Sequence, residues 1–402
     1  MLKGSFVMKY LFYLLPGLLN LVMGLFFFIT AKRLADAGAS SLAVTATTAI
    51  WALIYSAASF MIGKYTTRSN AVKIMLISQF ILLGSILGLL FSPDVKMQYL
   101  WLLFTGLGTG LFFAPFQTVV KMFEKVEIST ETFARSAGFY TCSWSIGQGC
   151  GQLLVGVIWG AFDPLNGWKY CYMINIAVLL AVIGTLLIMA KFIRKKLAEA
   201  PQNNLPDNAQ EQHIPSPGGQ PDIMKAIWFM ALGGFLGVGM LRAYLPDYCT
   251  KTLDLSTSTQ AYTLTLINLF QGAIALCCIK SRRWPFRPWG LLGASVLCIA
   301  SLLIMGSTGS GAMAQIAAAM FGCFSGLLAF NMTFHALANA DKSSRYAAGN
   351  ETIVGITSIL APISAGWIAD ISTPQLPFYI LILIIGCCAV IFTSQTWKHR
   401  KF

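Results

Sequence analysis

The chain has 402 residues, of which 56% are hydrophobic and only 11% are charged, and its formal net charge is +13. Soluble domains carry roughly 25% charged residues, so this composition excludes an ordinary soluble protein. The basic residues lie mainly between apolar stretches, not in a basic segment interleaved with aromatic residues, which argues against nucleic-acid binding.

Twelve apolar stretches fill the chain, each long enough to cross a bilayer. The hydrocarbon core is about 30 Å thick, and a helix that rises about 1.5 Å per residue crosses it with about 20 residues. Because the backbone finds no water in lipid, each crossing is expected to be a helix. The predicted spans of the first half are Met8–Phe28, Ser41–Ile62, Ala71–Phe91, Gln98–Val120, Ala137–Phe162 and Tyr170–Phe192. Those of the second half are Ala226–Leu245, Thr257–Ile279, Trp289–Met305, Ala312–Leu337, Ala347–Ala369 and Leu376–Ser394.

A polar segment separates the two sets of six spans. From Lys191 to Lys225 the chain is rich in Pro, Gly, Asn and Gln, and it cannot bury enough apolar surface to fold alone. We therefore predict an all-α integral membrane protein with an N-terminal six-helix bundle (residues 1–190), a flexible cytoplasmic linker (191–225) and a C-terminal six-helix bundle (226–402).

The distribution of basic residues predicts the topology. With the N-terminus in the cytoplasm, 22 of the 28 Lys and Arg residues lie on the cytoplasmic side. The others are Lys32, Arg33, Lys96, Lys169, Arg242 and Lys251. Cytoplasmic loops carry an excess of Lys and Arg, so both termini are predicted to be cytoplasmic.

A faint repeat relates the two sets of helices. At an offset of 210 residues, Ala137 aligns with Ala347 and Gly156 with Gly366, in stretches of small residues that open the fifth helix of each set. Small residues let helix backbones approach closely in lipid. Together with the layout of six spans, a linker and six spans, the repeat favours a duplicated transporter fold.

The connection after the second predicted span carries a motif. Gly63, Arg68 and Lys73 fit the glycine and basic positions of the loop G-x-x-x-D-R-x-G-R-R, while Thr67 replaces its aspartate and Asn70 its second glycine. Asn tolerates the left-handed turn that glycine serves there, and we expect Asn70 to adopt it. On this loop the chain resembles the major facilitator superfamily, in which the loop helps to hold one side closed. The resemblance implies that Gly63, Arg68 and Lys73 are gating residues, without the acidic latch.

Two further elements carry the resemblance, which covers nearly the whole chain. Gly167-Trp168-Lys169 is similar to the family's entry to the sixth helix, and Leu245-Pro246-Asp247-Tyr248 to its connection between the seventh and eighth. The resemblance implies two pseudo-symmetric six-helix bundles around a central cavity, lined by the first, fourth, seventh and tenth helices. Gln152 stands where proton antiporters of the family usually have proline, which argues against a drug/proton antiporter.

Five neutral polar residues lie near mid-membrane, and four of them, Asn20, Gln148, Asn268 and Gln271, are candidates for a substrate site, the fifth being Gln152. Burying an unpaired polar group costs several kcal/mol, so these residues need partners. We predict that the four candidates bind substrate, and the alternative is hydrogen bonding between helices. Asn268 and Gln271 are three residues apart on one helical face, which favours a shared site.

Arg242 is the most informative single charge, because it lies within the seventh predicted helix. A guanidinium keeps its charge and binds carboxylate or phosphate through two hydrogen bonds. We predict that Arg242 attracts an anionic or polar substrate group. The alternatives are that it reaches the membrane surface or pairs with Asp247.

Glu351 and His335 are the candidate ion-coupling residues. Glu351 is the acidic residue clearly inside a predicted helix, where it could bind a proton or cation or simply favour the positive helix end. His335, late in the tenth predicted helix, titrates near neutral pH in its unperturbed state. The alternative for His335 is a satisfied histidine at the membrane interface.

Trp51 and Tyr55 are four residues apart on one helical face, as a surface that binds sugars or rings requires. The alternative is that these aromatic residues fill the core or face lipid. The chain has no Walker loop, nucleophile elbow, HExxH or paired-carboxylate motif, so we expect no enzymatic activity, no cofactor and no metal site.

The sequence therefore predicts a secondary transporter of a small organic solute that works by alternating access, with or without a coupling proton or cation. Export of amphipathic compounds and a non-transporting receptor or assembly protein of the same fold are the alternatives. We expect a monomer in the bacterial inner membrane.

Overall fold

The computed structural model describes residues 2–67, 69–92, 94–123, 130–163, 165–199, 222–280, 287–339 and 342–397. All regular structure within these ranges is helical. The α-helices are α1 (Leu2–Asp36), α2 (Ser41–Tyr65), α3 (Ala71–Phe91), α4 (Gln98–Phe123), α5 (Thr130–Val155), α6 (Gly167–Glu199), α7 (Met224–Lys251), α8 (Thr257–Cys277), α9 (Pro288–Ser307), α10 (Gly311–Ala338), α11 (Ser343–Ile371) and α12 (Leu376–Trp397). Short helical segments precede α4 (η1, Val95–Met97), extend α5 (η2, Gly156–Phe162) and follow α8 (η5, Cys278–Lys280).

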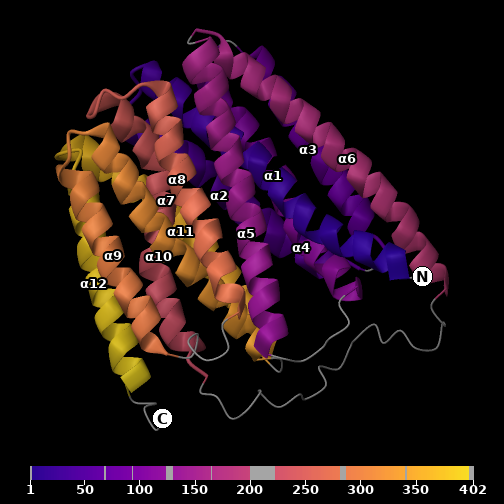
Figure 1. The fold of residues 1–402 in the computed structure, drawn as a ribbon. Coiled ribbons are helices and arrows are strands. Elements are labelled where there is room, and N and C mark those ends of the chain that lie inside the picture. Colours follow the sequence, from indigo (N-terminus) through magenta and orange to yellow (C-terminus); the bar gives the residue numbers. More distant parts are fainter. Residues whose placement is uncertain are drawn as a thin grey trace.

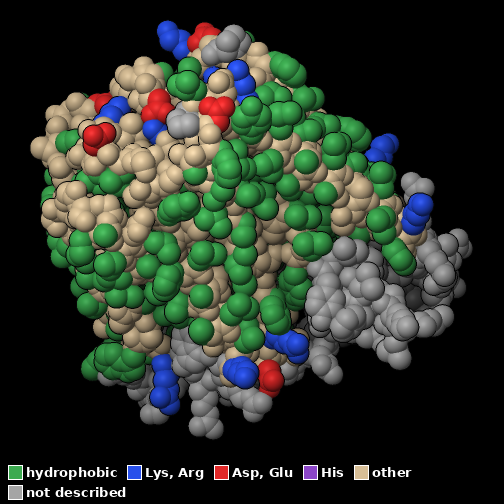
Figure 2. Space-filling model, turned by 45° about the horizontal axis from the view of Figure 1, so that its top comes forward, with side chains coloured by type: hydrophobic (Ala, Val, Ile, Leu, Met, Phe, Trp, Pro, Cys, Tyr) green, Lys and Arg blue, Asp and Glu red, His purple; other side chains and the backbone are tan. Residues whose placement is uncertain are grey.

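Ten of these helices are long and apolar enough to cross a membrane, judged by length and composition within the described ranges. α4 and α5 are not among the ten, although the sequence predicts spans there too. Figure 2 shows hydrophobic side chains over the flank of the molecule and charged side chains gathered toward its two ends. This distribution is typical of a protein whose flank faces lipid.

Several helices are longer than their predicted spans, because a helix can continue beyond the hydrocarbon region. α1 runs to Asp36, and α6 runs to Glu199, inside the segment predicted to be the linker. Residues 200–221 of that segment lie outside the described ranges. α5 continues as the π-helix η2, where Ser258 Oγ donates to the Gly156 carbonyl at 2.8 Å.

The packing order of the helices shows the direction in which each one runs. Along α1 and α5, Gly17 meets Ser143 and Leu21 meets Gly151, so these helices are parallel. Between α7 and α11 the residue numbers of contacting residues also increase together, so these two helices are parallel. Between α2 and α11, and between α5 and α8, the numbers increase in one helix and decrease in the other, so the helices of each pair are antiparallel. Odd-numbered helices in these pairs thus run one way and even-numbered helices the other, as in a chain that crosses back and forth (Figure 1).

Glycines allow the closest of these contacts. A Cβ on Gly24 of α1 would lie 2.2 Å from the Gln148 carbonyl oxygen, and one on Gly147 would lie 2.0 Å from the Gly17 carbonyl oxygen. No larger residue fits without moving the backbones apart. The glycine-rich stretch of α5 therefore packs directly on α1, which places Gln148 beside the middle of the bundle.

Candidate functional site

Arg242 lies inside the bundle and contacts residues from two other helices. Its Nη2 donates to Gln148 Oε1 of α5 at 3.2 Å, and its Cζ lies 5.2 Å from the centre of the Phe27 ring of α1. Its Nε is buried without a hydrogen-bond partner, and Arg242 forms no ion pair among the residues that the structure describes. Arg242 does not pair with Asp247, one of the alternatives that the sequence leaves open. It is a partly buried cation that, within the described ranges, contacts an amide and a ring but no acidic group.

A run of aromatic rings leads away from Arg242. The Phe27 and Trp51 rings meet edge to face with centroids 4.8 Å apart, and Trp51 stacks on Tyr55 at 5.0 Å with an interplanar angle of 14°. Trp51 Nε1 donates to Thr109 Oγ1 of α4 at 2.9 Å, which fixes the orientation of the indole. Tyr55 also contacts the edge of Phe113. The structure thus connects Arg242, Gln148, Trp51 and Tyr55, which the sequence predicts separately.

Glu351 lies beyond the Tyr55 end of this run. Its side chain is exposed, and Gly355, one turn further along α11, packs against Ser56, the neighbour of Tyr55 on α2. Glu351 therefore faces an accessible space beside the contact of α2 with α11. Within the described residues, the Glu351 carboxylate has no hydrogen-bond or ion-pair partner. Both Tyr55 and Tyr140 are half-buried.

The polar residues of α8 lie in a different setting. Asn268 Nδ2 donates to Gln152 Oε1 of α5 at 2.8 Å, and Gln271 Oε1 accepts from Ser325 Oγ of α10 at 3.1 Å. Asn268 and Gln271 are both almost fully buried. Both side chains thus form hydrogen bonds between helices, which is the alternative to substrate binding that the sequence leaves open.

The other predicted site residues, Asn20 and His335, make contacts within their own helices. Asn20 is half-buried and donates to the Pro16 carbonyl of its own helix at 2.9 Å. His335 is fully buried and meets the Phe334 ring edge to face. Neither contact adds a group to the space that Glu351 faces.

The predicted gating loop makes local contacts. Asn70 Nδ2 donates to the Tyr65 carbonyl at 2.8 Å, and Asn70 Oδ1 accepts from the Thr67 N–H at 2.7 Å. Asn70 has φ −103° and ψ −12°, so the expectation of a left-handed turn is wrong, because its side chain closes the loop instead. Gly63 and Lys73 are exposed, and Arg68 lies outside the described residues.

A polar cluster joins the helices at the end where α2 begins, and the sequence does not predict it. Asp370, near the end of α11, accepts the backbone N–H groups of Ser41 and Leu42 at 2.8 and 2.9 Å. Ser41 Oγ also donates to Asp247 Oδ2 of α7 at 2.5 Å, and Lys251 Nζ lies 2.7 Å from Asp247 Oδ1. We call Ser41, Asp247, Lys251 and Asp370 the polar latch.

The latch completes a connection between the first and second sets of helices. Lys251 Nζ donates to the Ala39 carbonyl at 2.6 Å, so the end of α7 is tied to the turn before α2. Below the latch, a Cβ on Gly366 would lie 2.1 Å from Thr45 Oγ1, and α2 and α11 stay in contact as far as Ser56 and Gly355. At this end α2, α7 and α11 are held together, whereas Glu351 lies one turn beyond the last of these contacts of α2 with α11.

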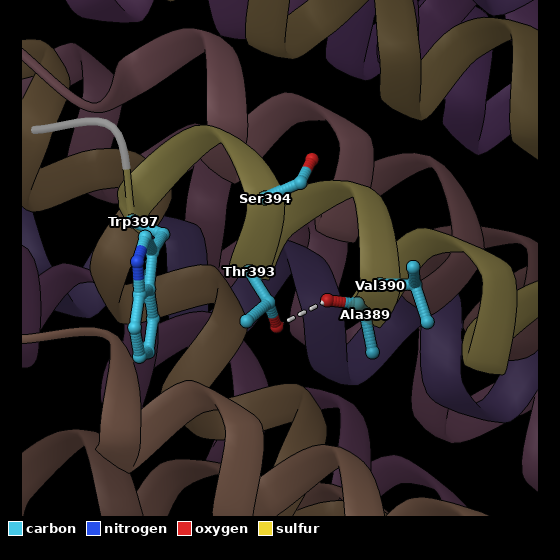
Figure 3. A pocket seen from close by; sticks show the side chains of 5 residues that line it. All are labelled: Ala389, Val390, Thr393, Ser394 and Trp397. Atoms are coloured by element: carbon cyan, nitrogen blue, oxygen red, sulfur yellow. Dashed lines mark hydrogen bonds between the residues drawn. The ribbon is translucent and has the colours of Figure 1, made fainter.

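A hollow on α12 is not part of this arrangement (Figure 3). Its volume is about 420 Å³, and its lining residues, Ala389, Val390, Thr393, Ser394 and Trp397, all come from one helix. The two hydroxyls are already engaged, since Thr393 donates to Ala389 and Ser394 to Ile391 of the same helix. The hollow therefore presents no free polar group to a ligand.

A comparison with protein families gives a match to the Major Facilitator Superfamily over residues 13–350, which is most of the chain. The chain belongs to the major facilitator superfamily. Members of the major facilitator superfamily are membrane transporters, and the ten apolar helices agree with a multi-pass membrane protein. A comparison with curated proteins found no match.

Membership of the major facilitator superfamily does not say which residues act, and sequence reasoning missed several. Tyr140 lies among many aromatic residues with no local pattern that singles it out. Asp370 and Ser41 are 329 positions apart, so only the fold brings them together. One signal was available, because an acidic residue near the C-terminal end of a helix is electrostatically unfavourable there and calls for a partner.

Proposed function

We propose that this protein is a secondary transporter that moves a small organic solute across a membrane by alternating access. In this proposal the chain crosses the membrane twelve times, as two six-helix bundles (residues 1–190 and 226–402) joined by a cytoplasmic linker, with both termini cytoplasmic. The alternating helix directions and the excess of basic residues on one side support this topology. We assign the protein to a bacterial inner membrane, and the excess of basic residues in the cytoplasmic loops is compatible with this location.

One observation carries the proposed mechanism. The polar latch joins α2, α7 and α11 at Ser41 and Asp370, while Glu351, beyond the other end of the contact between α2 and α11, is exposed. A transporter needs a state in which its site is sealed from one side and accessible from the other, and this arrangement has that form. With the proposed topology, the latch lies on the outer side and the accessible space faces the cytoplasm.

The proposed substrate site lies along this space. Arg242 offers a cation whose Nε has no hydrogen-bond partner in the part of the chain that the structure describes, and the stacked rings of Trp51 and Tyr55 offer a flat apolar wall. A partly buried guanidinium without an acidic partner is stabilised by an anionic ligand, because the ligand supplies the missing charge compensation. We therefore assign the anionic or polar end of the solute to Arg242, with Gln148 positioning the guanidinium.

Solute uptake into proteoliposomes tests the proposal. Labelled sugars, amino acids, nucleosides and organic anions are offered separately, and each uptake is repeated with the unlabelled solute inside the vesicles. Alternating access predicts saturable uptake that internal solute accelerates. A correctly folded protein that takes up none of these solutes would instead favour the non-transporting receptor or assembly protein.

A further inference from the structure

We infer that the solute is a hydroxylated organic acid, with its carboxylate at Arg242 and its hydroxyl groups at Ser145 and Thr141 of α5. This inference rests on the proposed transport function and names the class of substrate. It depends on one face of α5, on which hydroxyls that have no hydrogen-bond partner within the described ranges follow one another toward the contact with Arg242.

One face of α5 carries four polar residues, spaced by four, three and four positions: Thr141, Ser145, Gln148 and Gln152. These spacings place the side chains next to one another along a single side of the helix. We call the four residues the polar stripe of α5.

The polar stripe faces the second set of helices. Gln148 accepts a hydrogen bond from Arg242 of α7 at 3.2 Å, and Gln152 accepts one from α8 at 2.8 Å. A Cβ on Gly272 of α8 would lie 3.5 Å from the Ser145 Cβ. Because alternating access moves one set of helices against the other, the polar stripe becomes open to a solute when the two sets separate.

Two hydroxyls of the stripe lack partners. Thr141 Oγ1 and Ser145 Oγ are fully buried and form no hydrogen bond with any residue that the structure describes. A helical Ser or Thr commonly donates to the carbonyl four residues earlier, as Thr265 and Thr357 do, but these two hydroxyls do not. A buried hydroxyl without a partner is costly, and a hydroxyl of the solute would restore the missing hydrogen bond.

The third incomplete group is the guanidinium of Arg242. Its Nε is buried without a hydrogen-bond partner, and no acidic side chain in the described part of the chain pairs with it. Arg242 as a whole is only half-buried, so part of the side chain is accessible. A carboxylate accepts hydrogen bonds from a guanidinium in a planar fork and also supplies the missing negative charge, which the neutral amide of Gln148 does not.

One molecule can reach all three groups. At about 1.5 Å per residue, Ser145 lies about 4.5 Å and Thr141 about 10.5 Å before Gln148 along the axis of α5. The side chains of one helix lean in the same direction, so this order is kept. An extended chain covers about 1.1–1.2 Å per bond, so a six-carbon acid extends about 6 Å, and each O–H···O hydrogen bond adds about 2.8 Å. A carboxylate beside Gln148 therefore brings the nearer hydroxyls to Ser145 and those of a longer acid to Thr141.

Beyond Thr141 the same face of α5 becomes apolar. Ala137 and Ala134 belong to a cluster of buried apolar side chains with Phe330 and Phe334 of α10. This cluster limits the hydroxylated part of the solute to the length of the polar stripe.

Gluconate, a six-carbon acid with a hydroxyl on each of its other carbons, is the test ligand. Binding is measured by calorimetry on the purified full-length protein. Gluconamide replaces the carboxylate with a neutral amide, and hexanoate keeps the carboxylate but lacks the hydroxyls. We expect gluconate to bind about tenfold or more tightly than either, which is about 1.4 kcal/mol.

Substitutions assign the two ends. Arg242→Gln should bind gluconate and gluconamide equally, while still preferring gluconate to hexanoate. Thr141→Val and Ser145→Ala should each weaken gluconate about two- to tenfold and leave hexanoate unaffected. The melting temperature should not fall in either variant, because the hydroxyl that is removed has no partner in the fold. Glycerate, with three carbons, should respond to Ser145→Ala and not to Thr141→Val.

Thr396→Val is the matched control. Thr396 is almost fully buried, and its hydroxyl donates to the Phe392 carbonyl at 2.9 Å. It lies on α12, at the edge of the bundle and away from α5 (Figure 1). This variant should bind gluconate as tightly as the wild type does.

Each result decides between the hypotheses. Equal affinities for gluconate and gluconamide, or for gluconate and hexanoate, overturn the inference. So does a loss of affinity at Thr141→Val or Ser145→Ala that hexanoate shares or that accompanies a lower melting temperature, since such a loss reports packing. Failure of every probe to bind also overturns it, and the proposed transport function survives if any solute of the uptake panel is transported. Failure of that panel as well removes the transport function.

Discussion

Asp370 on α11 accepts the backbone N–H of Ser41, the first residue of α2, at 2.8 Å. Its second carboxylate oxygen accepts the next N–H, from Leu42, at 2.9 Å. A residue from one set of helices thus caps a helix of the other set, with its negative charge at the positive end of the α2 dipole. The same two hydrogen bonds therefore join α11 to α2 and satisfy backbone N–H groups in the first turn of α2.

Asp370→Asn is expected to weaken the latch, because the amide loses the charge and one of the two acceptor oxygens. Capping and dipole interactions are worth about 0.5–2 kcal/mol, so the closed end should open about two- to thirtyfold more often. The measurement is the alkylation rate of a cysteine introduced at the buried position Thr45→Cys, followed by mass spectrometry of that peptide.

The control for this variant is Asp94→Asn. Asp94 caps η1 through the Lys96 N–H and forms no hydrogen bond to another set of helices in the described residues. It should leave the alkylation rate at position 45 unchanged. An equal rise in both variants would mean that Asp370 does not hold the closed end.

Gly366→Ala is expected to force α2 and α11 apart. Its Cβ would lie 2.1 Å from Thr45 Oγ1 and 2.7 Å from the Leu42 Cα, and the second of these atoms belongs to the backbone. Overpacking of this kind costs about 1–3 kcal/mol. We expect slower exchange of solute across proteoliposomes, since the closed state at this end becomes harder to reach.

Gly386→Ala on α12 is the matched control, because its Cβ would meet nothing within 4 Å. Alanine is favoured over glycine in helices by roughly 0.5–1 kcal/mol, so this variant should be as stable as the wild type or more so. If Gly366→Ala exchanges solute as fast as Gly386→Ala does, the close approach of α2 and α11 is not required for transport.

Asp222, just before α7, gives the protein a pH-dependent contact. It accepts hydrogen bonds from Tyr346 and from Lys342, the latter at 3.0 Å. Partial burial alone would raise the pKa of Asp222, but the hydrogen bonds from Tyr346 and Lys342 outweigh it and hold the pKa below its ordinary value. The hydrogen bond and charge of Asp222 raise the pKa of Lys342.

The signs of these shifts set the pH window. The Asp222 contribution is fully present above the unfolded pKa, about 3.9, and is lost as the pH falls through the lower folded value. The Lys342 contribution is fully present below the unfolded pKa, about 10.4, and is lost as the pH rises through the higher folded value. The ion pair of Asp222 and Lys342 is largely exposed, so it contributes at most about 1 kcal/mol to the free energy of unfolding.

Asp222→Asn should therefore lower the melting temperature slightly at neutral pH, and the difference from the wild type should disappear once the pH falls below the lowered folded pKa of Asp222. Thermal unfolding of both proteins across this range provides the measurement. A difference that persists in strong acid would show that the aspartate acts through its shape and not through its charge.

The sequence was informative about the elements and less so about their contacts. Apolar length predicts the helices, because each crossing must satisfy its own backbone in lipid. Charge in an apolar helix draws attention to Arg242 and Glu351, since burial of a charge is costly without a reason. That these residues bind substrate or ions stays a prediction, to which the structure adds that Arg242, Gln148, Trp51 and Tyr55 are connected.

Other features had no local signal. The polar latch depends on the end of α11 meeting the start of α2, and ordinary helix-terminal residues give no indication of that pairing. The register of α7 and α11, in which Gly239 lies against Thr357 and Ala361, is likewise a property of the packing of distant helices. At Asn70 a local sequence rule gave a wrong prediction. The preference of Asn for a left-handed backbone predicted such a turn, but the Asn70 side chain closes the loop by a hydrogen bond to the Tyr65 carbonyl.

Asn268 and Gln152 distinguish the two roles that the sequence leaves open for the polar residues of α8. Their hydrogen bond, at 2.8 Å, is buried between α8 and α5. Asn268→Leu leaves Gln152 without this donor, and we expect a loss of about 1–3 kcal/mol in unfolding free energy, less if lipid-phase partners compensate. The double variant Asn268→Leu, Gln152→Leu removes both partners and should recover most of that loss, because no polar group is left unsatisfied.

Urea or detergent unfolding of the single and double variants supplies the free energies, and transport of one solute supplies KM. A role in packing predicts that the double variant recovers stability and keeps the KM of the wild type. A role in substrate binding predicts a raised KM in both variants, whatever their stability. Since Asn268 and Gln152 satisfy each other and are almost fully buried, whereas Arg242 and Glu351 retain unpaired groups, we expect the first outcome.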